Sequence, residues 1–315
     1  MSTGLAYIFP GQASQYAGMG KDLALNFAAA RAVFEEADDA LGFAISELCF
    51  EGSAEDLQLT ENTQPAILTV SVAALSAMQA EGFPPPDYVA GHSLGEYSAL
   101  VAARSLSLSD AVRTSRARGR YMQEAVPLGS GAMAAVMGAD LGTVMEICNE
   151  AAQGDVCTPA NINSANQIVI AGHAAAIDRA IELVKERGIK RALRLKVSAP
   201  FHCALMNPAQ ARLAEDLEKL EFHDLVTPLV TNVDAALIET GAEARDALIR
   251  QVSSPVRWLE SIELLLQQGV EKFVEAGPGK VLTGLVRQIK REALYLNVED
   301  AASLNATREA LLAVR

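Results

Sequence analysis

The sequence predicts a mixed α/β protein in which a small subdomain is inserted into a larger one, and three observations support this. A short apolar run over residues 5–9 stops at Pro10-Gly11, which is typical of a buried strand that enters a loop. A second apolar run, 88–90, is followed by a tight turn and a helical pattern over 96–104, the order found in a parallel sheet. The third observation is a change of pattern in the middle of the chain.

The middle of the chain predicts the order β-α-β-β-α-β, which is the ferredoxin-like pattern. We expect a strand over 132–137, a helix over 141–152, one or two strands within 161–171, a helix over 177–187 and a strand over 192–197. Glycines at 129 and 131 mark its entry, and Ser198-Ala199-Pro200 marks its exit. The predicted small subdomain is therefore 129–197. The large α/β subdomain comprises 1–128 and 198–315, and its pattern resumes with a strand over 273–275.

Composition narrows the classes of function. The chain has 315 residues, 50% of them apolar, and a net charge of −13, which argues against a general nucleic-acid binder or a partner of anionic membranes. No basic residue precedes Lys21, so we expect no signal or transit peptide. The longest uncharged stretch, 62–80, contains Pro65 and several polar residues and predicts a buried helix. Four scattered cysteines indicate reduced thiols, so we expect a cytoplasmic protein without metal or cofactor.

One segment has the spacing of a nucleophile elbow. Gly91-His92-Ser93-Leu94-Gly95 is a G-x-S-x-G that lies between a predicted strand and a predicted helix, the context that this motif requires. Ser93 would project from the turn at a helix N-terminus, where main-chain N–H groups favour a developing oxyanion. An ordinary strand-to-helix turn is the alternative.

A serine nucleophile needs a base, and His202 is the preferred candidate. It follows a predicted strand end where the chain re-enters the large subdomain, and open α/β sheets place their sites at carboxyl ends of strands. His173 opens a predicted helix and fits a capping role, and His223 lies in a charged segment typical of a surface. Cys203 is adjacent to His202, but neighbours on extended chain point to opposite faces, which argues against a Cys–His dyad.

Arg118 lies on a predicted helix that Ser109 or Asp110 caps and that ends near Ala125. Its face of this helix is small and apolar, opposite the solvated stripe formed by the other arginines. A buried guanidinium must find an anion. An internal carboxylate and a carboxylate on the substrate explain this placement equally well.

Two clusters of basic residues stand out against the acidic balance of the chain. One lies on the last predicted strand of the small subdomain and the other on a late helix, and each can equally be a solvated face. Gly277-Pro278-Gly279-Lys280 lacks the spacing of a phosphate-binding loop and indicates a tight turn. The two basic clusters are Lys190, Arg191, Arg194 and Lys196, and Arg287, Lys290 and Arg291.

The chain resembles the malonyl-CoA:acyl carrier protein transacylase family in six segments, which occur in the family's order over nearly its whole length. This resemblance implies transfer of a malonyl group from coenzyme A to the phosphopantetheine thiol of acyl carrier protein, and a hydrolase-like large subdomain beside the ferredoxin-like one. The segments are Phe9-Pro10-Gly11-Gln12-Ala13-Ser14-Gln15, Gly91-His92-Ser93-Leu94-Gly95-Glu96-Tyr97, Arg118-Gly119, Asn161-Ile162-Asn163-Ser164, Phe201-His202-Cys203-Ala204-Leu205-Met206 and Glu275-Ala276-Gly277-Pro278-Gly279-Lys280-Val281-Leu282-Thr283-Gly284.

The resemblance also implies roles for individual residues. Ser93 matches the family's acylated nucleophile and His202 its base, in a pair that has no triad acid. Gln251 matches the position whose main-chain carbonyl orients the histidine. Gln12 and Leu94 match the residues whose main-chain N–H groups form the oxyanion hole.

Arg118 matches the arginine that binds the malonyl carboxylate, which favours a substrate anion over an internal one. Asn163 lies in a matching segment, but we expect no catalytic role for it. Three departures or choices are notable. Ala13 replaces a usual glycine, Ser254 replaces a frequent asparagine, and Phe201 is the bulky choice associated with malonyl over methylmalonyl.

Two other functions compete with malonyl transfer. A serine esterase or thioesterase acting on acyl thioesters would share the elbow, but an arginine clamp without a triad acid fits transfer better. A non-catalytic scaffold that binds carrier protein would need a broken dyad, whereas Ser93 and His202 are both present. The expected partners are therefore malonyl-CoA and acyl carrier protein.

Overall fold

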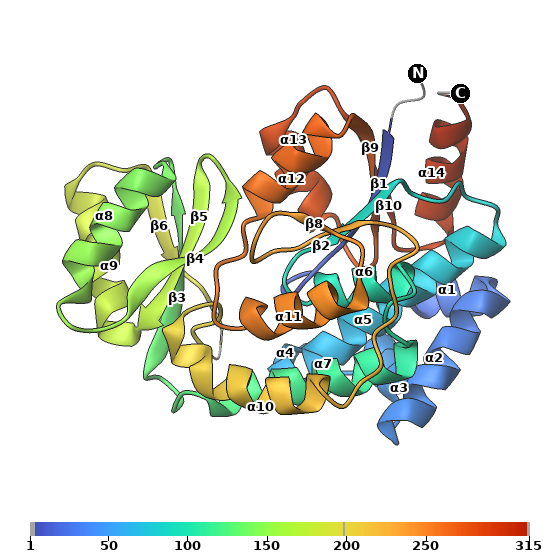
Figure 1. The fold of residues 1–315 in the computed structure, drawn as a ribbon, viewed down its shortest axis with the longest axis horizontal. Helices are drawn as coiled ribbons and strands as arrows, with labels where there is room; N and C mark the ends of the chain where they lie inside the picture. Colours follow the sequence, from blue (N-terminus) through green and yellow to red (C-terminus); the bar gives the residue numbers. More distant parts are fainter. Residues whose placement is uncertain (1–3, 198, 314–315) are drawn as a thin grey trace.

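The computed structural model describes residues 4–197 and 199–313, whose strands form two separate sheets (Figure 1). The larger sheet has the order β10-β9-β1-β2-β7-β8, in which β8 runs antiparallel to β7 and every other neighbouring pair is parallel. Its parallel core confirms the α/β prediction. Its strands are β1 (Gly4–Phe9), β2 (Tyr88–Gly91), β7 (Leu229–Val230), β8 (Leu237–Ile238), β9 (Val270–Ala276) and β10 (Leu294–Val298).

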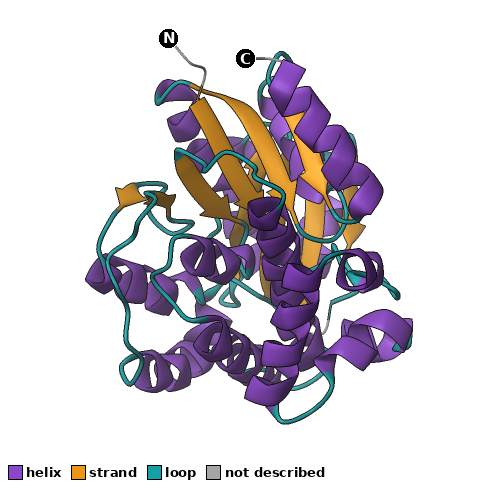
Figure 2. Ribbon diagram, turned by 90° about the vertical axis from the view of Figure 1, so that its right-hand side faces the viewer, coloured by secondary structure: helices purple, strands orange, loops and turns teal. Residues whose placement is uncertain are grey.

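Helices cover the larger sheet, as Figure 2 shows with its orange strands and purple helices. The predicted buried helix is α5 (Thr60–Ala80), which is apolar on nearly all sides and packs against α7 and α2. The other helices of this part are α1 (Lys21–Asn26), α2 (Ala28–Leu41), α3 (Ile45–Glu51), α4 (Ala54–Gln58), α6 (Gly95–Ala102), α7 (Leu108–Glu124), α10 (Asn207–Leu217), α11 (Gly241–Gln251), α12 (Trp258–Gln267), α13 (Val281–Ile289) and α14 (Ala301–Ala313), with a 3₁₀ turn at Ala204–Met206.

The smaller sheet lies beside the large part and is coloured green to yellow in Figure 1. Its order is β4-β5-β3-β6 with every pair antiparallel, and two helices complete the predicted β-α-β-β-α-β order. This is the ferredoxin-like arrangement. Its elements are β3 (Gly131–Met137), α8 (Leu141–Ala152), β4 (Cys157–Ser164), β5 (Gln167–His173), α9 (Ala174–Glu186) and β6 (Arg191–Arg194).

Alternation along the strands gives the smaller sheet two apolar faces. On β3, Ala134 and Val136 pack with α8 and α9, whereas Met133 and Ala135 belong to the core that the large part also forms. On β5, Val169 shares the second face. The smaller sheet therefore presents an apolar wall toward the larger one.

Two local predictions were wrong. The strand expected over 192–197 ends at Arg194, where the register of pairs with β3 stops, and beyond it the main-chain N–H of Leu195 still donates to the oxygen of Met133. Helix α7 is capped by Ser107, whose side chain accepts a hydrogen bond from the main-chain N–H of Asp110, so neither Ser109 nor Asp110 is the cap. The predicted subdomain boundary at residue 198 lies outside the described residues.

In the described part of the chain, no helix combines the length and the apolar character that a bilayer span requires.

Candidate active site

The loops after three neighbouring parallel strands meet at one edge of the larger sheet. Gln12 follows β1, Ser93 follows β2 and Asn232 follows β7, and these strands lie side by side in the order β1-β2-β7. Carboxyl ends of parallel strands are where open α/β sheets bind their ligands.

Ser93 occupies a strained turn. Its φ is +52°, in the left-handed region that non-glycine residues avoid. The flanking glycines, Gly91 and Gly95, are needed because neighbouring main-chain atoms lie too close to them to leave room for a Cβ. A Cβ on Gly91 would lie 1.9 Å from the carbonyl carbon of Gly95, and one on Gly95 would lie 2.0 Å from the carbonyl oxygen of Phe9. The motif therefore packs helix α6 directly onto β1 and β2.

Ser93 and His202 form a hydrogen-bonded pair. Oγ of Ser93 lies 2.7 Å from Nε2 of His202, and Nδ1 lies 3.0 Å from the main-chain oxygen of Gln251 and 3.2 Å from that of Ser254. A carbonyl oxygen only accepts, so Nδ1 carries the proton and the lone pair of Nε2 faces the serine. Burial, reinforced by the charge of Arg118, lowers the pKa of His202 to about 3, so the ring is neutral at pH 7.

The other candidate bases do not reach Ser93. His173 is the N-cap residue of α9, as predicted, although its side chain makes no capping hydrogen bond and its Nδ1 accepts from the main-chain N–H of Val156. His223 is exposed, as predicted. His202 itself lies on a loop beyond β6, so the strand-end reason for preferring it was wrong.

Cys203 takes no part in the dyad. Its Sγ donates to the main-chain oxygen of Pro200 at 3.1 Å, and burial raises the pKa of the thiol to about 11. The predicted absence of a Cys–His pair agrees with this geometry.

Arg118 is buried to 1% exposure and forms no salt bridge within the described residues. Burial lowers the pKa of its guanidinium, and the nearby Tyr97 and Glu96 oppose this effect. Its Nη1 donates to Oε1 of Gln64 at 2.7 Å, and its Nη2 donates to Oε1 of Gln251 at 2.9 Å and to Oγ of Ser93 at 3.2 Å. All three acceptors are neutral. The internal carboxylate that the sequence left open is therefore not in contact with the guanidinium.

A cavity of about 260 Å³ surrounds these groups and lies between the two sheets. Gln12 and Leu94 line it, and their main-chain N–H groups donate to no described residue, whereas the N–H of Ser93 donates to Oδ1 of Asn232. The apolar lining comes from both parts of the structure. The wall of the smaller sheet contributes Met133, Ala135 and Val169, and the segment after β6 contributes Leu195, Val197 and Phe201. The large part contributes Leu94, Met122, Val281, Leu282 and Leu285.

Three residues of the site were missed from the sequence. Oδ1 of Asn232 accepts from the N–H of Ser93 at 2.6 Å, and its Nδ2 donates to the oxygen of Gly91 at 2.6 Å. Glu96 is 1% exposed and accepts from Asn232. Gln64 supports Arg118. A polar Asn232 just after an apolar strand at the sheet edge was the available signal.

Asn163 contacts the elbow instead of the dyad. Its Oδ1 lies 2.8 Å from Nε2 of His92, which connects β4 of the smaller sheet to the turn that holds Ser93. This placement agrees with the expectation that Asn163 is not catalytic.

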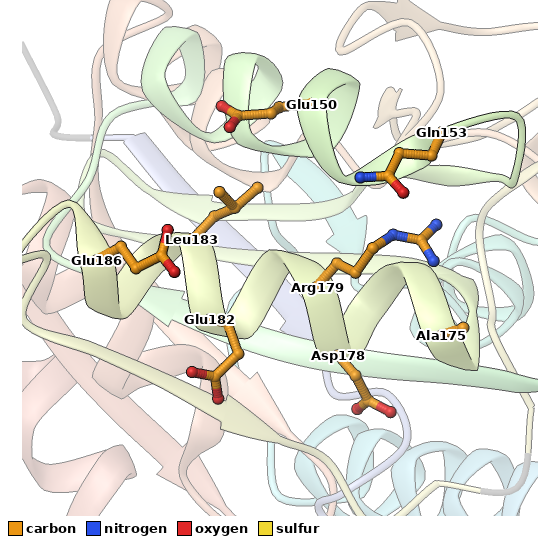
Figure 3. Close-up of a pocket in the computed structure, with 8 residues that line it drawn as sticks. All are labelled: Glu150, Gln153, Ala175, Asp178, Arg179, Glu182, Leu183 and Glu186. Carbon is orange, nitrogen blue, oxygen red and sulfur yellow. The ribbon is translucent and has the colours of Figure 1, made fainter.

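A larger hollow of about 600 Å³ lies between α8 and α9, away from Ser93 (Figure 3). Carboxylates of Glu150, Asp178, Glu182 and Glu186 border it, together with Arg179, whose guanidinium is paired with Asp155. None of the residues that line it is a histidine, cysteine or serine. This hollow therefore has no nucleophile and base of the kind that Ser93 and His202 form in the smaller cavity.

Comparison with known proteins decides the family. The family model described as the acyl transferase domain matches residues 6–310. A malonyl CoA-acyl carrier protein transacylase from Bacillus subtilis is 46% identical over 308 residues, covering 98% of this chain and 97% of the relative. This chain belongs to the malonyl-CoA:acyl carrier protein transacylase family. Membership makes it an acyltransferase.

Further members of the transacylase family agree in sequence and in structure. The Escherichia coli transacylase is 50% identical over 287 residues, covering 91% of this chain and 93% of the relative. The solved Coxiella burnetii transacylase has a TM-score of 0.96 at 42% identity and covers 99% of this chain and 98% of its own. A malonyl-transacylase in complex with a type II PKS acyl-carrier protein has a TM-score of 0.95 at 45% identity. The match covers 98% of this chain and 100% of that transacylase.

Proposed function

We propose that this acyltransferase moves a malonyl group from malonyl-CoA to the phosphopantetheine thiol of acyl carrier protein, through a malonyl ester on Ser93. The relatives are named for this activity, and one solved relative is in complex with an acyl-carrier protein. The observation that favours it most is the buried guanidinium of Arg118, which forms no salt bridge in the described part of the chain, beside a Ser–His pair. The product supplies extender units for fatty acid or polyketide synthesis.

In the first half-reaction Ser93 is the nucleophile and His202 the base. As Oγ attacks the thioester carbonyl, its proton passes to Nε2 of His202, which lies 2.7 Å away. The N–H groups of Gln12 and Leu94 hold the tetrahedral oxyanion, each such donor contributing ~3–4 kcal/mol. The carbon–sulfur bond then breaks, and the coenzyme A thiolate takes the proton from His202 and leaves as the thiol.

The second half-reaction reverses these steps with a different thiol. The phosphopantetheine thiol gives its proton to His202 and attacks the malonyl ester on Ser93. The carbon–oxygen bond to Ser93 breaks, and Oγ recovers its proton from the imidazolium. The main-chain oxygen of Gln251 holds the ring in the required tautomer throughout. Transfer is therefore ping-pong, without a triad carboxylate.

Arg118 binds the free carboxylate of the malonyl group. Its guanidinium contacts only neutral acceptors, so a substrate carboxylate adds an ion pair without displacing an existing one. A bidentate contact there fixes the acyl group relative to Ser93. The same contact favours malonyl over uncharged acyl groups.

A serine esterase or thioesterase is the second candidate, because it would use the same elbow and base. The test is to follow malonyl-CoA consumption with and without holo acyl carrier protein. Stoichiometric appearance of malonyl carrier protein, with slow release of malonate when the carrier is omitted, supports transfer. Rapid malonate release that the carrier does not compete with contradicts it.

We also propose the compartment and the division of the chain. The protein is cytoplasmic, which the scattered, free cysteines support. The smaller sheet, with residues 129–197, is a subdomain, and residues 1–128 and 198–315 form the large one. The separate sheet of this segment and the core between that sheet and helices α8 and α9 support this division.

The acidic carrier docks on the basic cluster of Lys190, Arg191, Arg194 and Lys196. All four side chains are exposed, and Lys196 borders a hollow of about 400 Å³ that reaches the loop of Gln12. Arg194 is paired with Asp178, whereas the other three form no salt bridge with a residue that the structure describes. The late-helix cluster is the second choice.

A further inference from the structure

Glu96 is a buried carboxylate at the base of the elbow, in the first turn of α6. It is 1% exposed and forms no ion pair with any residue that the structure describes. Its Oε2 accepts from the main-chain N–H of Asn232 at 2.8 Å and from Nε2 of Gln251 at 3.1 Å, while Oε1 is buried without a hydrogen bond. Burying such a group is costly, and packing alone does not account for it.

The contact of Glu96 with Gln251 fixes the orientation of the Gln251 side-chain amide. A carboxylate oxygen accepts hydrogen bonds, so the NH₂ of Gln251 must face Glu96, from where it also donates to the main-chain oxygen of Ser93 at 3.0 Å. The amide oxygen is then directed to Nη2 of Arg118. If the side-chain amide of Gln251 were rotated by 180°, its NH₂ group would face the guanidinium of Arg118, and two hydrogen-bond donors would oppose each other.

The same residue, Gln251, holds His202 through its main chain. The main-chain oxygen of Gln251 accepts from Nδ1 of His202, so a shift of this residue would move both the base and the arginine. Gln251 ends helix α11, and in the described contacts its side chain is tied to α6, α7 and the elbow.

The contact of Glu96 with Asn232 supports the strained turn at Ser93. Asn232 gives its main-chain N–H to Glu96, and its side chain then bridges the N–H of Ser93 and the oxygen of Gly91. These two bonds hold Ser93 in its left-handed conformation. Through Asn232, Glu96 therefore acts on the nucleophile as well.

We propose that Glu96 is a positioning residue, whose single carboxylate oxygen fixes Gln251 and Asn232 and through them aligns Ser93, His202 and Arg118. This proposal rests on the proposed function for the identity of the substrate. What matters is the reach of the side chain and an acceptor at Oε2, not the negative charge. Burial raises the pKa of the Glu96 carboxyl to about 7, and the neutral acid keeps the same acceptor.

Two variants separate reach from charge. Glu96→Gln keeps the length and an acceptor oxygen but loses the charge, whereas Glu96→Asp keeps the charge and is one methylene too short to serve both donors. We expect Glu96→Gln to retain kcat for malonyl transfer within about threefold. We expect Glu96→Asp to lose kcat by tenfold or more with KM for malonyl-CoA changed less than threefold, which is the pattern of lost alignment.

A second readout needs no acyl substrate. The rate at which a fluorophosphonate labels Ser93 reports the alignment of serine and base, and it should fall in Glu96→Asp in parallel with kcat and stay near wild type in Glu96→Gln. Thermal melting of both variants corrects for the folded fraction. Wild-type labelling and kcat in folded Glu96→Asp, or equal losses in both variants, would overturn the proposal.

The labelling result also separates this proposal from the proposed function. If the wild-type protein labels at Ser93 but transfers no malonyl group, the function is wrong, and the comparison of the two variants still decides the role of Glu96.

Discussion

Nη2 of Arg118 lies 3.2 Å from Oγ of Ser93, so the serine accepts from a guanidinium on one side and donates to His202 on the other. The cation is buried and has only neutral hydrogen-bond acceptors among the described residues. One side chain can therefore bind a substrate carboxylate, favour negative charge on the serine oxygen and lower the pKa of the histidine.

Removing the guanidinium should reduce malonyl preference more than acylation itself. Hydrogen bonds to charged groups contribute roughly 1.5–3 kcal/mol, so Arg118→Ala should lower the malonyl-to-acetyl ratio of kcat/KM by about 10- to 100-fold. Competition between the two coenzyme A esters, read by mass of the acyl-enzyme, measures this ratio. Full discrimination in the variant would show that the carboxylate binds elsewhere.

The rate of acylation should not show the usual fall below neutral pH that protonation of a histidine base causes. Because the pKa of His202 is lowered to about 3, the base stays unprotonated, and the rate of Ser93 acylation by acetyl-CoA should not fall between pH 8 and pH 5. Arg118→Gln removes a charge that lowers this pKa, so the loss of activity on acidification should begin at a higher pH. A wild-type inflection near 6.5 would contradict the assignment.

Charge reversal on the docking cluster should weaken carrier binding selectively. Lys190→Glu with Arg191→Glu should raise KM for acyl carrier protein several-fold, more at low salt, and leave malonyl-CoA hydrolysis and KM unchanged. Steady-state transfer kinetics at two salt concentrations measure this. The matched control is Lys290→Glu with Arg291→Glu on the late-helix cluster; if only that pair raised the carrier KM, the docking site would be there.

The loop of Gln12 contains strain that a glycine would relieve. Ala13, which replaces the family's usual glycine, has a φ of +86°. A left-handed conformation costs a non-glycine residue roughly 1–2 kcal/mol. Glycine avoids this cost but loses more conformational entropy on folding, which lowers the stability by about 0.5–1 kcal/mol. Ala13→Gly should therefore raise the free energy of unfolding by about 0.5–1 kcal/mol.

Urea unfolding is the measurement for this change, with Ala306→Gly in the exposed middle of α14 as control. The same substitution there should lower the free energy of unfolding by about 1 kcal/mol. Equal destabilisation at both positions would contradict the account of Ala13.

Local patterns predicted much of the fold and the reacting pair. The G-x-S-x-G spacing placed Ser93, and the β-α-β-β-α-β order placed the smaller sheet, because each depends on neighbours in sequence. The end of the strand expected over 192–197 was wrong, because pairing with β3, which is distant in sequence, determines that it ends at Arg194. The position of His202 after a predicted strand gave only a preference for it as the base, and the family resemblance supplied its role and the substrate carboxylate as the partner of Arg118.

The supporting contacts were not predictable from local pattern. Glu96 meets Asn232 across 136 positions in sequence and Gln251 across 155. An acidic residue in the first turn of a helix is ordinary for dipole reasons, so Glu96 carried no sign of burial. Only its hydrogen bonds to Asn232, which follows β7, and to Gln251, which ends α11, make it part of the site.

Intact mass after brief incubation with malonyl-CoA tests the central claim most directly. Wild-type protein should gain one malonyl group, Ser93→Ala should gain none, and added holo acyl carrier protein should remove the group while becoming malonylated itself. Accumulating malonate with no adduct, or an adduct that persists in Ser93→Ala, would contradict transfer through this serine.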